Sequence, residues 1–448
     1  MPGQTSRADW GVALVLVVAL LLVYNANGRE IGSYDSQTTK FAARELLLRG
    51  TLSLNYVVGA VPAYAERSAF VLCRDGRYRS AYSPVPSILA AGIAYPFWRA
   101  GLLDHRSPAT PTLIAVMAAS LLTALSVALL YFAARRRVSR GRALAIAIGL
   151  GVGTGFWSLV SQTLWQHETA VFGLAIAVTA FSMSEDELGA RAALGAALGL
   201  ALAGLARPQL APLIAVMLAG IWVRAPRRAA LAAIAVVVAS AATLMFFNWR
   251  WFGAPLGALP MLVDVNNSVH DTRSWFDWRF AGLAGLLVSP SRGLLIFSPI
   301  VAVALIGFRH AFRANWQSPL RWCALAAVAQ FLLYASYSVW WAGHTYGPRY
   351  MLDVLPLLVP PAAAAIALVR LRSVAGAVCV AALAWSIVIA ETGAFYYPHD
   401  QWNSDPADID RDHARLWSWS DPQFLRCWRT GPSPQNFQLF ALYPPPKQ

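Results

Sequence analysis

The sequence predicts an all-α polytopic membrane protein, and three observations lead to this fold class. Hydrophobic residues make up 57% of the 448 positions and charged residues only 13%, which no soluble globular domain matches. Apolar runs of about 15–25 residues recur along the chain, close to the ~20 residues that a helix needs to cross the hydrocarbon core. Arginines gather in short linkers between these runs, as the positive-inside rule requires.

The apolar runs give the expected membrane spans in order. The first run, residues 10–24, is expected to be a retained anchor because no small-residue cleavage site follows it. The later runs bring the expected bundle to about 11 transmembrane helices. They are residues 111–134, 143–160, 169–183, 192–206, 210–223, 229–247, 293–308, 322–340, 351–369 and 373–391.

The apolar segment 84–103 is harder to place, because Pro84, Pro86 and Pro96 interrupt it and proline breaks a helix beyond its first turn. If this segment crossed the membrane fully, the strongest basic linker would share a side with the polar first loop. If it is instead a juxtamembrane or re-entrant helix, the basic linkers all fall on one face. We therefore expect a cytoplasmic N-terminus and an extracytoplasmic C-terminus. The basic linkers are residues 135–142, 224–228, 309–321 and 370–372.

This topology divides the chain into a membrane domain and a short tail. The membrane domain covers residues 1–391 and carries a long first extracytoplasmic loop, residues 25–103. The tail, residues 392–448, is too short for an independent domain and is expected to cap the membrane domain. The net charge of +14 does not indicate nucleic-acid binding, because the arginines are dispersed among the membrane linkers.

Asp35 stands near the start of the long first loop. Residues 33–36 can begin a helix, and Gly50 is expected to end it. Asp35 could simply be the N-cap of this helix, which is worth ~1 kcal/mol. It could instead be a carboxylate at the lipid–water boundary that takes a proton from an attacking hydroxyl.

His167 and Glu168 form a second polar pair, at the outward start of another span. An ionisable pair beside a hydrophobic span is costly and usually functional. The alternative is a pair that caps the helix and points into water. Because mixed nitrogen and oxygen ligands suit Zn or Mn, Asp35, His167 and Glu168 are also candidate ligands of a divalent metal.

Three arginines are expected on the outer face, against the charge rule. Arg349 follows a Gly-Pro turn at a helix start, where its fork and the helix dipole can clamp a phosphate. Arg207 and Arg292 are the next candidates, with general contact to lipid phosphates as the alternative. The tryptophans and tyrosines around Arg349 are also typical of an interfacial aromatic belt.

The loop residues resemble motifs of the GT-C superfamily, whose members are polytopic glycosyltransferases that use polyprenyl-phosphate sugars. Asp35 followed by residues 41–47 resembles the acidic first-loop motif, although Ser36 stands where the family usually has Glu. Residues 82–86 resemble the Pro-Pro segment that precedes a short helix at the membrane surface. Residues 340–350 resemble a Tyr-Gly-Pro-Arg-Tyr segment of bacterial members, and His167 or Glu168 occupies the place of a second family acid. Within the superfamily, the chain resembles the protein O-mannosyltransferase and lipid A aminoarabinose transferase group.

The resemblance implies a GT-C-like bundle and a bacterial, inverting glycosyltransferase in the cytoplasmic (inner) membrane. Such an enzyme moves a monosaccharide from a polyprenyl-phosphate donor to a glycan, lipid or protein acceptor at the outer face. Asp35 would be the general base, and His167 and Glu168 would orient the acceptor or a divalent metal. The candidate substrate-binding residues are Arg349, Arg207, Arg292, Tyr346, His344 and Tyr82.

Two other functions remain as alternatives to this interpretation. A secondary transporter would show inverted repeats and charges at the bilayer midplane, whereas the polar residues of this chain gather at one face. A ligase or polymerase of lipid-linked glycans would also act on the outer side but would not need the first-loop acid.

The cysteines offer one candidate disulfide. Cys73 and Cys427 both fall outside in the expected topology, where an oxidising compartment permits a bridge. Such a bridge would tie the tail to the first loop.

Overall fold

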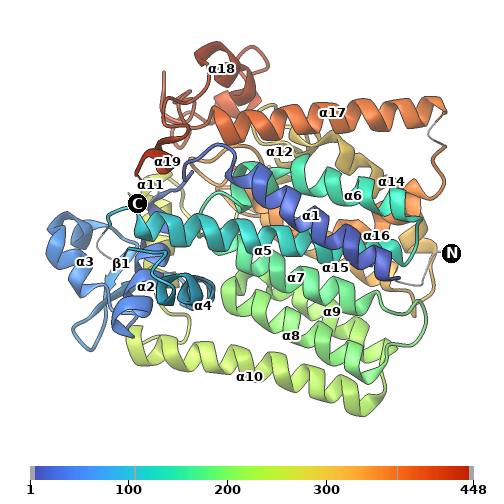
Figure 1. The fold of residues 1–448 in the computed structure, drawn as a ribbon, viewed down its shortest axis with the longest axis horizontal. Helices are drawn as coiled ribbons and strands as arrows, with labels where there is room; N and C mark the ends of the chain where they lie inside the picture. Colours follow the sequence, from blue (N-terminus) through green and yellow to red (C-terminus); the bar gives the residue numbers. More distant parts are fainter. Residues whose placement is uncertain (1–5, 105–106, 371, 443–448) are drawn as a thin grey trace.

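Long helices lie side by side and run from one end of the molecule to the other (Figure 1). The structure is a computed structural model that describes residues 6–104, 107–370 and 372–442. Within these residues, helices long and apolar enough to span a membrane are α1 (Arg7–Asn25), α5 (Thr110–Arg135), α10 (Arg227–Phe252) and α17 (Val374–Phe395). Shorter apolar helices are α7 (His167–Phe181), α8 (Ala190–Ala206), α9 (Ala211–Arg224), α15 (Pro319–Ala335) and α16 (Leu355–Ile366). The chain is a multi-pass, all-α membrane protein, and the number of crossings stays a prediction.

The predicted spans 143–160, 293–308 and 351–369 are interrupted in the structure and are not continuous helices. Pro299 is one reason, because the ring removes a backbone donor and restricts the residue before it. Irregular backbone at membrane depth is tolerated where protein surrounds it. The pieces are α6 (Arg140–Val152) with the π-helical turn η2 (Phe156–Val160), then α13 (Leu294–Phe297), η4 (Pro299–Val301) and α14 (Ala302–Arg313), and the 3₁₀ turn η5 (Arg349–Asp353) ahead of α16.

Side-chain contacts hold basic linkers together at one end of the bundle. Arg137, after α5, pairs with Glu185 in the turn between α7 and α8. Arg224, at the end of α9, donates to the carbonyl of Ser184 in that same turn, at 2.6 Å. Arg142 donates to backbone carbonyls just beyond α16. We call this the basic end; its contacts bring these linkers together at one end of the bundle, and the membrane face that they occupy stays a prediction.

The other end of α1 meets the start of α5, so the chain between them returns to where it began. Glu30, just after α1, accepts a hydrogen bond from Thr112 in the first turn of α5, at 2.9 Å. Between them, α4 (Val85–Arg99) packs against α2 (Tyr34–Arg49) and α5 at this end (Figure 1). This packing is consistent with a juxtamembrane position of segment 84–103, which stays a prediction.

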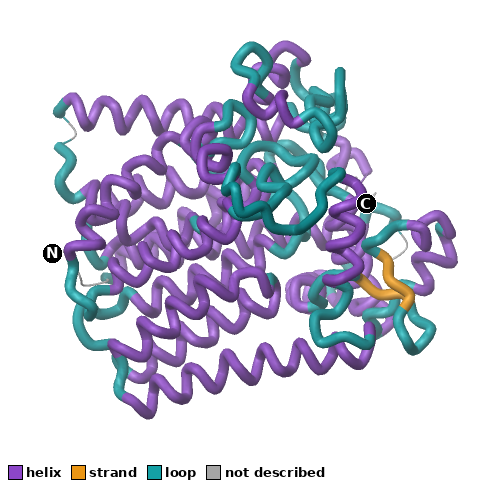
Figure 2. Tube along the Cα trace, turned by 180° about the vertical axis from the view of Figure 1, so that it is seen from behind, coloured by secondary structure: helices purple, strands orange, loops and turns teal. Residues whose placement is uncertain are grey.

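The first loop and the tail gather at this second end, which we call the site end. α2 begins after Ser33 and ends at Gly50, whose φ of +63° is the left-handed conformation that favours glycine at a helix end. A small antiparallel hairpin, β1 (Phe70–Leu72) with β2 (Tyr78–Ser80), belongs to the same loop (Figure 2). The tail reaches back to α1, because the backbone N–H of Phe437 donates to the carbonyl of Asn27 at 2.8 Å. The remaining short elements are α3 (Asn55–Ala60), η1 (Pro62–Glu66), η3 (Pro208–Leu210), α11 (Leu259–Val269), α12 (Gly282–Val288), η6 (His413–Trp417), α18 (Gln423–Thr430) and α19 (Gln438–Leu442).

Candidate active site

Asp35 lies in the first turn of α2, and its carboxylate is partly open to solvent. Ser33 is the N-cap of the helix, so the alternative that Asp35 is the cap is wrong. The carboxylate is 38% exposed and accepts a hydrogen bond from the Tyr82 hydroxyl at 2.7 Å. Burial, together with the neighbouring Asp35 charge, raises the pKa of Tyr82 well above its ordinary value of 10. Tyr82 therefore stays a neutral donor that holds the carboxylate in place.

Arg349 meets Asp35 from the other side of the site. It follows Gly347, whose φ of +62° permits the tight turn that starts η5. Its Nη2 lies 3.2 Å from Oδ2 of Asp35, and its Nε donates to Nε2 of His167 at 3.3 Å. The guanidinium also lies 3.6 Å from the centroid of the Trp165 ring, a cation–π contact that fixes its plane. The side chain remains 16% exposed, so part of it is accessible to solvent.

A buried layer lies behind Arg349 and is centred on Asp353. The carboxylate of Asp353 accepts from Nδ1 of His167 at 3.0 Å and from the Tyr334 hydroxyl at 2.7 Å. Nε of Arg207 lies 3.1 Å from the same carboxylate. Because a carboxylate only accepts, Nδ1 of His167 carries the proton and Nε2 presents its lone pair to the arginines. Nη1 of Arg207 is 3.2 Å from that Nε2, so both Arg207 and Arg349 donate to a neutral imidazole.

The close packing of α7 against α8 explains why His167 and Arg207 meet. His167 is the first residue of α7, and Arg207 directly follows the last residue of α8. At the crossing, a Cβ built on Gly173 would lie 2.6 Å from the carbonyl oxygen of Gly199, and the reverse contact would be 2.5 Å. Only glycine fits this approach, and small residues are what allow membrane helices to pack backbone to backbone.

Glu168 does not join the group around Asp35. Its side chain is fully buried, and Oε1 accepts from the Thr169 hydroxyl at 3.1 Å. Oε2 has no hydrogen-bond partner among the described residues. The alternative that His167 and Glu168 point into water is wrong, because both are buried.

Asp353, Tyr334 and Trp165 are site residues that the sequence analysis did not select. Asp353 could have been found from sequence, because it is an acid inside an apolar run. Acidic residues are rare within membrane spans and usually functional. Trp165 precedes the His-Glu pair, but it looks like any interfacial tryptophan. No sequence signal distinguishes Tyr334 from other tyrosines in the spans.

The candidate metal ligands Asp35, His167 and Glu168 do not form a ligand set. Both ring nitrogens of His167 already have partners, Asp353 on one side and two cationic arginines on the other. Guanidinium groups repel a divalent cation. In the described part of the chain, the group of His, Asp or Glu side chains whose ligand atoms converge lies elsewhere, around His344.

Arg292 and Tyr346 serve the packing of the tail and are not part of the Asp35 group. Arg292 is fully buried and donates to the side chains of Gln423 at 2.8 Å and Asn403 at 2.6 Å, as well as to backbone carbonyls. Tyr346 is also buried, and its hydroxyl donates to the carbonyl of Ile389 at 2.8 Å. Both residues join the loop before Arg349 to the tail and the last span.

The predicted Cys73–Cys427 disulfide is not formed. Both are free, buried thiols. Cys73 belongs to the hairpin of the first loop, beside Arg79, whereas Cys427 is in α18 beside Asp400. The two cysteines therefore lie in different surroundings. The expected topology placed both on one side of the membrane, but it could not show whether they lie close together.

Solved structures with the same fold are known, although no family model and no curated protein matches the chain. ArnT from Cupriavidus metallidurans, bound to undecaprenyl phosphate, aligns with a TM-score of 0.50 and 14% identity. The alignment covers 98% of this chain and 77% of ArnT. The Archaeoglobus fulgidus oligosaccharyltransferase aligns with a TM-score of 0.46 and 11% identity. This alignment covers 93% of this chain and 60% of the oligosaccharyltransferase chain. ArnT is a GT-C glycosyltransferase, so this chain has the GT-C membrane fold that the sequence resemblance indicated.

Proposed function

We propose that this chain transfers a monosaccharide from a polyprenyl-phosphate donor to an acceptor hydroxyl. The observation that carries the proposal is the meeting of two partly exposed groups, the Asp35 carboxylate and the Arg349 guanidinium. A base for the acceptor and a cation for the donor phosphate are what this transfer needs. The GT-C fold supports the same donor class, since ArnT is seen with undecaprenyl phosphate.

The active site would face outward from a bacterial cytoplasmic membrane. Asp35 and Arg349 lie at the site end, opposite the basic end where Arg137 and Arg224 meet the α7–α8 turn. Because basic linkers stay in the cytoplasm, the site end would be extracytoplasmic, with the N-terminus inside and the C-terminus outside.

Arg349 would bind the donor phosphate. A planar guanidinium fork can make two parallel, charge-assisted hydrogen bonds to phosphate, and this side chain is partly exposed. Arg207 is only 4% exposed and is paired with Asp353, so it would contribute positive potential and not direct contact. His167 would be a positioning residue, because its Nε2 accepts from Arg349 and holds the fork toward the site.

Asp35 would be the general base, once phosphate has replaced it as the partner of Arg349. The acceptor oxygen attacks the anomeric carbon from the face opposite the phosphate, and its proton passes to the Asp35 carboxylate. The bond between the anomeric carbon and the phosphate oxygen breaks, and polyprenyl phosphate leaves with the bonding electron pair. A single displacement of this kind inverts the anomeric centre.

The test uses purified protein in liposomes with radiolabelled undecaprenyl-phosphate monosaccharides, each offered with an extract of bacterial membrane glycolipids. We expect the wild type to consume one donor and release undecaprenyl phosphate, and Glu66→Gln, an exposed acid of the same loop, to do the same. Binding of each labelled donor is measured in parallel, so that a missing acceptor does not hide the site. Labelled diphosphate-linked glycans are offered in parallel, and consumption of these alone would favour the ligase alternative. Failure to bind any monophosphate donor would overturn the proposal.

A further inference from the structure

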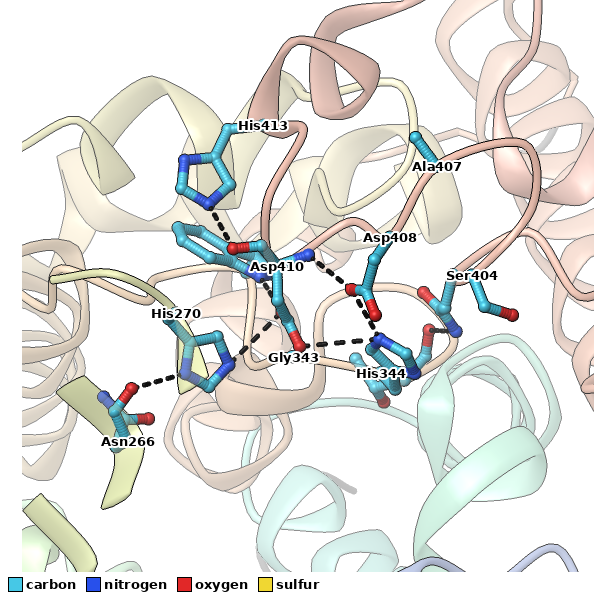
Figure 3. A network of polar contacts seen from close by, with 12 residues as sticks. Asn266, His270, Gly343, His344, Ser404, Ala407, Asp408, Asp410 and His413 are labelled. Carbon is cyan, nitrogen blue, oxygen red and sulfur yellow. Dashed lines mark hydrogen bonds and ion pairs between the residues drawn. The ribbon is translucent and has the colours of Figure 1, made fainter. Parts of the chain in front are cut away.

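Two histidines and two aspartates from three distant segments converge at the site end (Figure 3). Nε2 of His344 lies 3.0 Å from Oδ1 of Asp408 and 3.5 Å from Oδ2 of Asp410. Nε2 of His270 lies 3.3 Å from the other oxygen of Asp410. His270 follows α11, His344 is in the loop that leads to Arg349, and the aspartates belong to the tail. None of the four takes part in the chemistry proposed above.

The hydrogen bond on the far side of the His270 ring shows which nitrogen is free. Nδ1 of His270 lies 2.8 Å from the backbone carbonyl of Asn266, and a carbonyl only accepts, so Nδ1 carries a proton. In the neutral ring, Nε2 then presents a lone pair directly to the carboxylate of Asp410. The lone pair of Nε2 and the lone pairs of the carboxylate oxygen repel each other, so a positive charge between them is needed to stabilise this arrangement. Histidines that ligate metals usually donate their other ring N–H to a carbonyl in this way.

The carboxylates are also held by donors from outside the group. The indole N–H of Trp341 donates to Oδ1 of Asp410 at 2.8 Å. The backbone N–H of Asp410 donates to Oδ1 of Asp408 at 2.9 Å. Hydrogen bonds to ligating carboxylates fix their orientation and are a regular part of metal sites.

We propose that this cluster binds a divalent transition cation, zinc first, through His344, Asp408 and Asp410, with His270 as a fourth donor. The ligand atoms of the first three all lie within 4.8 Å of one another. Zinc–nitrogen and zinc–oxygen bonds of about 2.0–2.2 Å in a tetrahedron place neighbouring ligand atoms about 3.3–3.5 Å apart. Two of the separations, 3.3 Å and 3.5 Å, match this spacing, and the His344–Asp408 separation of 3.0 Å is slightly shorter. Two imidazoles beside two carboxylates suit zinc better than Mg²⁺ or Ca²⁺.

A divalent cation can reach this cluster from solvent. Its binding would connect the tail to the loop that carries Arg349. The side chains of His344 and Asp408 are 44% and 43% exposed, whereas Asp410 and His270 are nearly buried. His344 precedes Arg349 by only a few residues, so a cation here would hold that loop against the tail and against the loop after α11. The inference does not rest on the proposed transfer reaction.

The experiment measures zinc on the purified full-length protein in detergent, after chelation, dialysis and addition of ZnCl₂. We expect about one zinc per chain by elemental analysis, and a melting temperature that rises with zinc because the ion binds the folded state. His344→Ala and Asp408→Asn should each weaken zinc binding at least about tenfold. His399→Ala removes an exposed histidine of the same tail and should bind zinc as the wild type does.

Cobalt offers a second readout that does not depend on stability. Cobalt in a nitrogen–oxygen site of this kind gives visible absorption bands, which should appear in wild type and His399→Ala and disappear in His344→Ala. Asp408 is at the surface, so Asp408→Asn keeps the test usable if His344→Ala folds poorly. Equal zinc content in wild type, His344→Ala and Asp408→Asn, or no zinc on the wild type, would overturn the proposal and show imidazolium–carboxylate pairs only.

Discussion

Arg349 and Asp35 are joined by an ion pair, with 3.2 Å between the guanidinium Nη2 and the carboxylate Oδ2. The two residues lie 314 positions apart in the sequence, one in the first loop and one ahead of α16. Both side chains are partly exposed, and pairs of this kind contribute about 0–1 kcal/mol. The singly charged phosphodiester of the donor can therefore replace the carboxylate at low cost, which links donor binding to release of the proposed base.

Asp35→Asn is expected to lower turnover by about 10²–10⁴-fold, because the amide cannot accept the proton of the acceptor. Donor binding should persist, since Arg349 loses only a competing partner. Turnover and donor retention by purified protein measure the two effects separately, with Glu66→Gln as the matched control. A variant that keeps more than about a tenth of wild-type turnover would contradict the base role.

Arg349→Ala is expected to raise the KM for the lipid donor, because a charge-assisted contact to phosphate is worth about 1.5–3 kcal/mol, or roughly 10–100-fold. Arg349→Lys should restore only part of this, since an ammonium cannot form the bidentate fork or lie flat on Trp165. Arg99→Ala removes an exposed arginine of α4 at the same end and should leave KM unchanged. Unaltered donor affinity in both Arg349 variants would assign Arg349 to the interfacial belt alone.

Gly199→Val is expected to push α8 away from α7 and to separate Arg207 from His167. The added side chain would meet the Gly173 carbonyl and the Ala177 backbone, and overpacking of this kind costs about 1–3 kcal/mol. Thermal unfolding should show the lost stability, and donor binding should fall because His167 no longer positions Arg349. Gly141→Ala is the control, since its Cβ meets nothing within 4 Å. Wild-type donor affinity in Gly199→Val would show that the crossing does not organise the site.

The sidedness of the membrane domain can be tested by labelling single cysteines in a cysteine-free background. We expect Arg228→Cys, in the first turn of α10, to react only from the cytoplasm. Ala60→Cys in the first loop and Ser404→Cys in the tail should react only from outside. All three positions are exposed, so burial does not limit labelling. Labelling of Arg228→Cys and Ala60→Cys from the same side would mean that α4 crosses the membrane.

The sequence alone determined the features that depend on local chemistry. Apolar length, proline and cap residues placed α2 between Ser33 and Gly50, and the distribution of arginine predicted a juxtamembrane α4. These signals work from sequence because hydrophobic burial and the positive-inside rule act on each segment separately. The GT-C resemblance followed from short motifs in loops, where functional residues concentrate.

Only the tertiary structure decided which of the polar residues meet. Arg207 and Arg292 are both expected on the outer face and both stand near a proline in sequence, yet one lies behind Arg349 and the other joins the tail. The difference comes from helix packing: the glycine crossing of α7 and α8 brings Arg207 to His167, while Arg292 faces Asn403. Contacts between residues so far apart in the chain depend on how closely whole helices approach, and no local pattern of residues records that distance.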